Sequence, residues 1–214
     1  HSKPSNNFKD WEVRGDWSFG TRGGKNKWYP GLQTNFQDSN DSILLSQSIP
    51  SGKVRSGNFY HVGPFIGVGF DEKAGPEIDY TFDENRVFKH GPIELNWKAR
   101  TDWKEGVLYG TVFSAANASN YLMKVINTDV PIKIPLNLGS DDGIKVYLNG
   151  QLVLGNNIER GAAPDQEKIT LALNKGRNLV LLKIYNGGGA SGFYYKSGAD
   201  QVPKPSLAID LSCE

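Results

Sequence analysis

The hydrophobic residues of this chain recur at every second position over short stretches, and turn residues separate these stretches. A period of two is that of a β-strand with one buried face. Strands are predicted at residues 121–126, 132–138, 144–148, 152–154, 169–173, 179–184 and 193–195. No stretch of ten or more residues keeps a helical period. The pattern therefore predicts an all-β fold, an antiparallel β-sandwich that is jelly-roll-like.

Two of these stretches carry further detail. Residues 179–184 are almost continuously apolar, which indicates a central strand covered on both faces. In residues 144–148, Lys145 and Tyr147 alternate with aliphatic residues and are expected on a polar face. Asn149–Gly150 follows directly and favours a type I′ hairpin turn, whose two central residues need positive φ.

The first half of the chain is less regular. Residues 59–70 predict one or two strands, interrupted at Gly63–Pro64 because proline cannot donate to a ladder. Residues 71–105 are too long for a plain connection, so short strands or a functional loop are expected there. Residues 107–113 predict a short strand, and residues 115–118 a helical turn or a loop.

Length and charge narrow the classes of protein. The 214 residues fit one large domain or two small ones, and we interpret residues 1–214 as a single domain in which residues 1–59 are the less regular part. The net charge is +1, with 24 basic and 23 acidic residues, so nucleic-acid binding through a basic face is disfavoured. No apolar stretch reaches the length of a membrane span. The single Cys213 allows no internal disulfide or thiolate cluster, and is either an incidental free thiol or the mark of a cut from a longer chain.

The acidic turn, Ser140–Asp141–Asp142–Gly143, is the main candidate for chemistry. Calcium takes six to eight oxygen ligands, so Asp141 and Asp142 need help from loop carbonyls or from an amide such as Asn186. The alternative is structural, with the two carboxylates accepting backbone N–H groups and fixing the turn.

Aromatic residues in polar surroundings are candidates for stacking on sugar rings. Those expected to contact ligand are Trp28, Tyr29, Trp97 and Trp103, of which Trp28 and Trp103 are favoured. Lys27 belongs to a basic stretch that would suit an anionic polysaccharide. The alternative is that each tryptophan belongs to the core or to a strand edge.

A third group combines Lys145 and Tyr147 with Arg160, whose loop is expected to fold over their strand and contact the ligand. The alternative is a solvated face with an internal ion pair.

The segments 139–150, 157–166, 176–189 and 192–194 resemble the galactose-binding-like, jelly-roll modules of polysaccharide-degrading bacteria such as planctomycetes. The resemblance covers residues 60–196. A more distant likeness is to the sugar-binding domain that yeast flocculins and other adhesins share with anthrax protective antigen. In the adhesins an aspartate pair joined by a cis peptide binds calcium, which holds sugar hydroxyls, and Asp141 and Asp142 match that pair.

The resemblance implies a secreted, cell-surface or periplasmic carbohydrate-binding module that binds a polysaccharide or oligosaccharide and neighbours a catalytic domain in a longer chain. Two alternatives stay open: a structural domain that packs on a catalytic one, and a small polysaccharide lyase or glycoside hydrolase. An enzyme is disfavoured because no HExxH-type spacing and no Gly-x-Ser-x-Gly motif occurs in the sequence.

Overall fold

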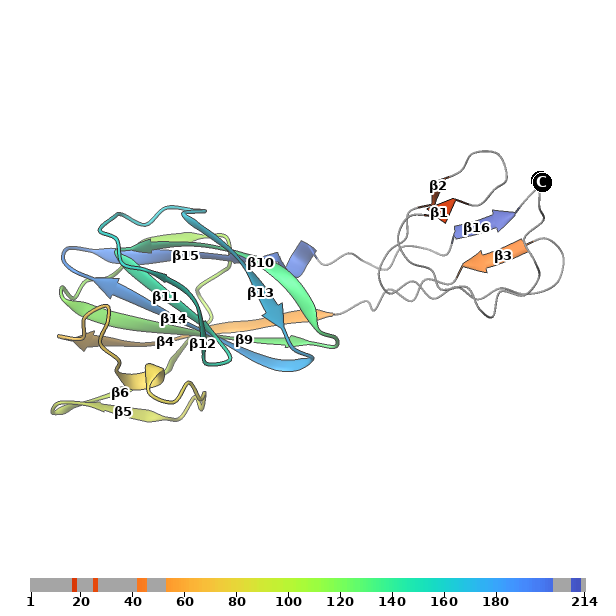
Figure 1. Ribbon diagram of the computed structural model, residues 1–214. Helices are drawn as coiled ribbons and strands as arrows, with labels where there is room; N and C mark the ends of the chain where they lie inside the picture. Colours follow the sequence, from red (N-terminus) through yellow and green to blue (C-terminus); the bar gives the residue numbers. More distant parts are fainter. Residues whose placement is uncertain (1–16, 19–24, 27–41, 46–52, 202–208, 213–214) are drawn as a thin grey trace. The chain divides into compact units, whose positions relative to one another are not determined.

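The computed structural model (Figure 1) describes residues 53–201 and four short strands outside that range. By its internal contacts the chain divides into two compact units, residues 52–202 and residues 1–51 with 203–214. In the smaller unit, β1 (Trp17–Ser18) pairs with β2 (Lys25–Asn26), and β3 (Ser42–Leu45) pairs with β16 (Ile209–Ser212). Residue 60, where the region of family resemblance begins, lies inside a strand of the larger unit. The interpretation of residues 1–214 as a single domain stays a prediction.

The larger unit is built around two large antiparallel sheets. The six-stranded sheet has the order β12–β11–β14–β9–β4–β7 and the four-stranded sheet has the order β13–β10–β15–β8. The strands of the first are β4 (Val54–Ile66), β7 (Lys98–Arg100), β9 (Ala118–Thr128), β11 (Gly143–Leu148), β12 (Gln151–Asn156) and β14 (Gly176–Asn186). Those of the second are β8 (Leu108–Phe113), β10 (Ile132–Asp141), β13 (Glu167–Leu173) and β15 (Ser191–Ser197), which the short 3₁₀ helix η3 (Gly198–Gln201) follows.

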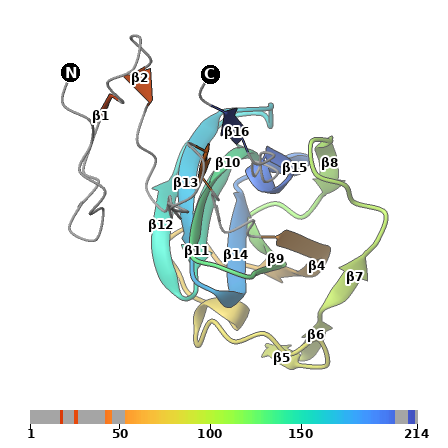
Figure 2. The same cartoon turned by 90° about the vertical axis from the view of Figure 1, so that its right-hand side faces the viewer.

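The two sheets face each other across the main core, as the end-on view of Figure 2 shows. Leu122 and Leu182 from the larger sheet pack with Leu136 and Phe193 from the smaller one, and all four are at most 1% exposed. Alternate residues of each strand point into this space, which is why the period of two is visible in the sequence. The predicted all-β fold is confirmed, whereas its jelly-roll character stays a prediction.

A third layer covers the outer face of the larger sheet. It contains the 3₁₀ helix η2 (Gly75–Glu77) and the hairpin of β5 (Val87–His90) and β6 (Ile93–Asn96), drawn below β4 and β9 in Figure 1. A second apolar cluster lies between this layer and the sheet, with Tyr121, Met123 and Leu181 buried in it. The central strands of the larger sheet are therefore covered on both faces.

Because the third layer buries the outer face of the larger sheet, it decides which of the strand predictions are confirmed. Residues 180–184 of β14 are all buried between β11 and β9, which confirms the central strand. For residues 144–148 the prediction of one polar face is wrong, because Tyr147 is 4% exposed beneath the covering segment. The hairpin turn is confirmed, with φ of 51° at Asn149 and 85° at Gly150. Gly63–Pro64 lies within a continuous β4 and its peptide bond is cis.

Candidate functional site

The acidic turn connects the two sheets, since β10 of the smaller sheet ends at Asp141 and β11 of the larger sheet begins at Gly143. The Asp141–Asp142 peptide bond is cis. The Ser140 hydroxyl donates to the Asp142 carbonyl (2.7 Å), and the Ser191 hydroxyl donates to the Asp141 carbonyl. The Asp142 N–H donates to the Tyr185 carbonyl (2.8 Å). The backbone of the turn is therefore held from both sheets.

The Asp142 carboxylate fastens two loops to this turn. One oxygen accepts the Arg160 N–H (3.1 Å), and the other accepts the Gly187 N–H (2.8 Å). These donors belong to the β12–β13 and β14–β15 connections. The structural role proposed as the alternative is thus present at Asp142, although each carboxylate oxygen keeps a second lone pair that can serve another ligand.

Asp141 is in a different situation. Burial, followed by the neighbouring charge of Asp142, raises the pKa of its carboxyl group, and the Ala162 N–H offsets part of that rise. No salt bridge joins Asp141 or Asp142 to a side chain of the described residues. Two carboxylates therefore lie at adjacent positions without a cationic partner there.

Arg160 lies beside the acidic turn but its guanidinium is committed elsewhere. It donates to the Ser140 carbonyl (3.3 Å) and the Ser140 hydroxyl (3.0 Å), and it pairs with Glu167 at 2.9 Å. Its loop therefore packs on the acidic turn and not on the face of β11, where the sequence placed it. The expected ligand contact of Arg160 stays a prediction, and the internal ion pair of the alternative is present.

Asn186 belongs to the same end of the sandwich. Its side-chain amide donates to the Ala115 carbonyl (2.9 Å) and the Gly189 carbonyl (3.0 Å), while Oδ1 accepts the Gly188 N–H (3.0 Å). Asn186 thereby joins the β14–β15 loop to the β8–β9 loop. Among the described residues, no three His, Cys, Asp or Glu side chains come together, so a cation at the acidic turn needs amide or carbonyl oxygens as well.

The structure corrects the expectation for two aromatic residues. Trp103 is 4% exposed and packs in the main core against Phe193, with the Arg100 guanidinium 3.8 Å from its ring centroid. Trp97 is 7% exposed in the second cluster. Neither ring is free to stack on a sugar, because the aromatic side chains of the core and of the third layer cover them. Both tryptophans are core residues, as the alternative interpretation of the sequence expected.

Lys145 and Tyr147 also differ from expectation. The Tyr147 hydroxyl donates to Glu77 (2.7 Å) inside the second cluster, so the solvent-facing role expected for it is wrong. The Lys145 ammonium lies 3.3 Å from Asp71 and 4.4 Å from the centroid of the Phe70 ring. Lys27, Trp28 and Tyr29 lie outside the described residues, so their ligand contacts stay predictions.

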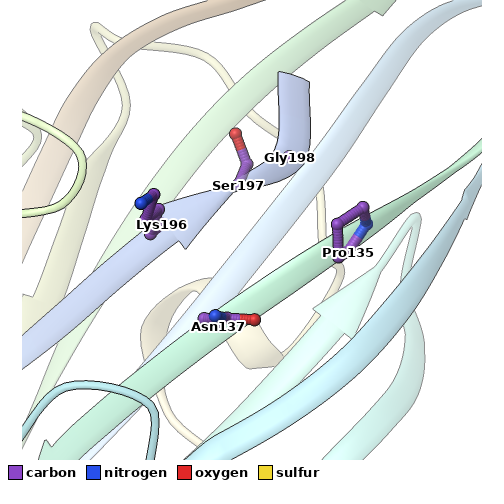
Figure 3. A pocket seen from close by; sticks show the side chains of 5 residues that line it. All are labelled: Pro135, Asn137, Lys196, Ser197 and Gly198. Carbon is purple, nitrogen blue, oxygen red and sulfur yellow. The ribbon is translucent and has the colours of Figure 1, made fainter. Parts of the chain in front are cut away.

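Two hollows of the larger unit have polar residues among their lining. One, of about 120 Å³, is on the smaller sheet, where Asn137 of β10 pairs with Lys196 of β15. Figure 3 shows these two residues with Pro135, Ser197 and Gly198, which also line the hollow. The other, of about 110 Å³, has His61 and Asn120 among its lining residues. Only the second contains a buried side-chain polar atom without a hydrogen-bond partner in the described part of the chain, Nδ2 of Asn120. His61 and Asn120 are 59 residues apart in the sequence, and no short motif indicates that they meet.

His61 leads to a prediction about pH. Burial lowers its pKa to about 4 from the ordinary 6.5, so the folded state holds the ring neutral where the unfolded chain protonates it. The unfolded state binds the extra proton between these values, and stability must fall as the pH drops from 6.5 to 4, by about 3 kcal/mol in full. Urea unfolding at pH 7 and pH 4.5 should show a smaller fall for His61→Gln than for the unchanged protein. Parallel profiles would contradict this.

No protein-family model matches this sequence, and no curated protein matches it. Among solved structures, the PA14 sugar-binding domain from an RTX adhesin matches 73% of this chain and 94% of its own, with 13% identity and a TM-score of 0.38. The PA14 domain of the MpAFP antifreeze protein matches 44% and 49%, with 14% identity and a TM-score of 0.30.

A β-glucosidase from Kluyveromyces marxianus in complex with glucose is also similar in part. It matches 38% of this chain at 19% identity with a TM-score of 0.29, and the match spans 10% of the β-glucosidase. At such TM-scores these likenesses carry no argument about function. Among the described residues, no helix is long and apolar enough to cross a membrane.

Proposed function

We propose that this protein is a non-catalytic carbohydrate-binding module. It binds a polysaccharide or oligosaccharide at the loop end of the larger unit, around the acidic turn. The observation that carries the proposal is the pair of adjacent carboxylates at Asp141 and Asp142, which has no cationic partner among the described side chains. The resemblance of the surrounding segments to sugar-binding modules supports the same assignment. A secreted or surface location and a neighbouring catalytic domain belong to this proposal.

Calcium fits the chemistry of this turn. It prefers carboxylate, amide and carbonyl oxygens, which Asp141, Asp142 and the loop of Asn186 present. Its charge would offset the burial and the neighbouring Asp142 charge, which together raise the pKa of Asp141. Asp141 and Asp142 would hold the ion, and Asn186 would contribute Oδ1 in place of its bond to Gly188. A calcium ion bound there would supply a positive centre to which sugar hydroxyls could coordinate. The protein's own part is to fix the turn, through Ser140, Ser191 and the two backbone donors to Asp142.

We expect Asp141→Asn to weaken calcium binding about tenfold or more, since it removes one charged ligand and leaves the Asp142 bonds in place. Calorimetric titration with calcium measures this. Glu94→Gln is the matched control, because Glu94 is an exposed carboxylate on β6 and its loss should leave calcium affinity unchanged. Equal calcium affinity in the two variants would contradict the site.

A glycan array, read with and without chelator, tests the binding function itself. The intact chain should bind at least one class of glycan with micromolar to millimolar affinity, because a shallow loop surface buries little area. Chelator and Asp141→Asn should each weaken glycan binding strongly. Binding that chelator leaves unchanged would remove calcium from the proposal, and an array without any signal would overturn the function.

One observation favours a second candidate, a structural domain that packs on a catalytic neighbour. Trp97 and Trp103 are in the cores, so these two of the three predicted tryptophans are not presented to a sugar. A domain of this kind would show no signal on the array and would protect its neighbour against thermal unfolding. A lyase or hydrolase would release reducing ends or unsaturated products from acidic polysaccharides, and the same preparations can be assayed for these.

A further inference from the structure

The hollow that contains His61 opens where β4 and β9 of the larger sheet meet β8, the edge strand of the smaller sheet. Pro64, Val112 and Phe113 give it apolar walls, while His61 and Asn120 give it polar ones. Its volume is about 110 Å³, whereas one water molecule needs roughly 10–15 Å³ by the same measure. The hollow therefore has room for a group of several heavy atoms.

Asn120 supplies the reason to expect a ligand. Its side chain is 1% exposed, and Oδ1 lies 2.9 Å from Nε2 of His61, but Nδ2 has no partner. Buried amides in folded proteins are otherwise satisfied, so the free Nδ2 indicates an acceptor that the described residues do not provide.

His61 supplies the complementary group. Its ring stacks on Phe113 at 5.1 Å between centroids, which fixes its orientation. The ring is neutral near pH 7, so it carries one donor and one acceptor nitrogen. A ligand that accepts from the free Nδ2 of Asn120 and also bonds the acceptor nitrogen of this ring must both accept and donate. A hydroxyl group does both, a carboxylate only accepts and an ammonium only donates.

The hollow is joined to the acidic turn through one loop. The Ala115 carbonyl, at the edge of the hollow, accepts from Asn186 (2.9 Å). Gly187, which follows Asn186 in the sequence, donates its N–H to the Asp142 carboxylate (2.8 Å). When one unit of an oligosaccharide binds at the acidic turn, a neighbouring unit of the same oligosaccharide can therefore lie close to the hollow.

We propose that the hollow lined by His61, Pro64, Val112, Phe113 and Asn120 is a second binding subsite, which takes a hydroxyl-bearing arm such as the hydroxymethyl group of a sugar. The identification of the arm as part of a saccharide rests on the proposed function. The apolar walls contact the C–H groups of the arm, and Asn120 and His61 bond its hydroxyl. This subsite needs no metal ion.

Titration of the isotope-labelled full chain with glycerol, and with the methyl glycosides of glucose, galactose and mannose, tests this subsite by NMR. All samples contain a chelator, so the acidic turn does not contribute through calcium. We expect saturable shifts of the His61 ring nitrogens and of the Asn120 side-chain amide with at least one probe. Ala115→Leu narrows the hollow, and His61→Phe removes the ring nitrogens, so each should weaken that binding roughly fivefold to tenfold.

Ala172→Leu is the matched control, since Ala172 is exposed on β13 and lies outside the hollow. It should bind the probes like the unchanged protein. Absence of saturable shifts with all four probes would overturn the subsite, and so would binding that Ala115→Leu leaves unchanged. Shifts at His61 and Asn120 in a protein that binds no glycan on the array would support the subsite while overturning the proposed function. Glycan binding that Asp141→Asn weakens and Ala115→Leu leaves unchanged would support the proposed function and overturn the subsite.

Discussion

Glu77→Gln is expected to lower the free energy of unfolding by about 3–5 kcal/mol, because it leaves a buried charge without its partner. Glu77 and Lys183 are both 0% exposed, and Nζ of Lys183 lies 3.0 Å from the Glu77 carboxylate. Urea unfolding near pH 7, followed by intrinsic fluorescence, measures the loss.

The carboxylate of Glu77 is the centre of a network between the third layer and the larger sheet. It accepts the hydroxyls of Tyr121 and Tyr147, each at 2.7 Å. Lys183 also donates to the Phe70 carbonyl (3.0 Å) and to the Glu72 carbonyl. Burial and the nearby carboxylate raise the pKa of both tyrosines, so the phenols stay protonated as donors. The network fastens residues 70–77 to β9, β11 and β14.

A double-mutant cycle separates the network from simple packing. Lys183→Met alone should also be strongly destabilising, whereas the combination with Glu77→Gln should recover a large part of the loss, because no uncompensated charge then remains. Glu84→Gln is the control, since Glu84 accepts the Tyr60 hydroxyl (3.1 Å) at an exposed position and should change stability by less than about 1 kcal/mol. Additive losses in the cycle would contradict the coupling.

The same network shows how far the sequence predicts this fold. The period of two located most strands of the larger unit, because alternate residues of each strand point into the main core. It did not reveal the third layer, since residues 67–97 are irregular and their contacts depend on three-dimensional packing. Tyr147 and Trp97 therefore looked like exposed polar or aromatic positions, while the structure places both under this layer.

The acidic turn could be predicted from the sequence because its four residues are adjacent. The residues that surround it in the fold could be predicted only in part. Nothing in a linear pattern shows that the N–H groups of Arg160 and Gly187 both reach Asp142, because they come from different loops. His61 and Asn120 are 59 residues apart and meet only because β4 pairs with β9. Sites assembled from neighbouring strands require the register, which depends on the whole sheet.

Gly139→Ala should damage both the fold and the acidic turn, and this is the second large effect we expect. A Cβ atom at residue 139 would lie 1.8 Å from the Ala163 carbonyl oxygen and 2.9 Å from its carbonyl carbon. Backbone atoms cannot yield as the end of a long side chain can, so the β12–β13 loop must move away from β10. We expect a loss of roughly 2–4 kcal/mol in the free energy of unfolding.

The displaced loop carries contacts that hold the acidic turn. Gln166 accepts the Ser140 N–H (3.0 Å), and Arg160 donates its N–H to Asp142 (3.1 Å). If this turn is the cation site, Gly139→Ala should weaken calcium binding about tenfold as well, even under conditions where the variant is fully folded. Thermal unfolding and calorimetric titration measure the two effects separately.

Gly161→Ala is the matched control for this substitution. Gly161 lies in the same loop, and a Cβ atom there would meet no atom within 4 Å. We therefore expect its stability to stay within about 0.5 kcal/mol of the unchanged protein. If Gly139→Ala unfolds and binds calcium like Gly161→Ala, the close approach of the loop to β10 does not position the acidic turn. If Gly139→Ala loses stability but keeps its calcium affinity, the loop supports the fold alone and the cation site depends on other contacts, foremost the Gly187 N–H to Asp142.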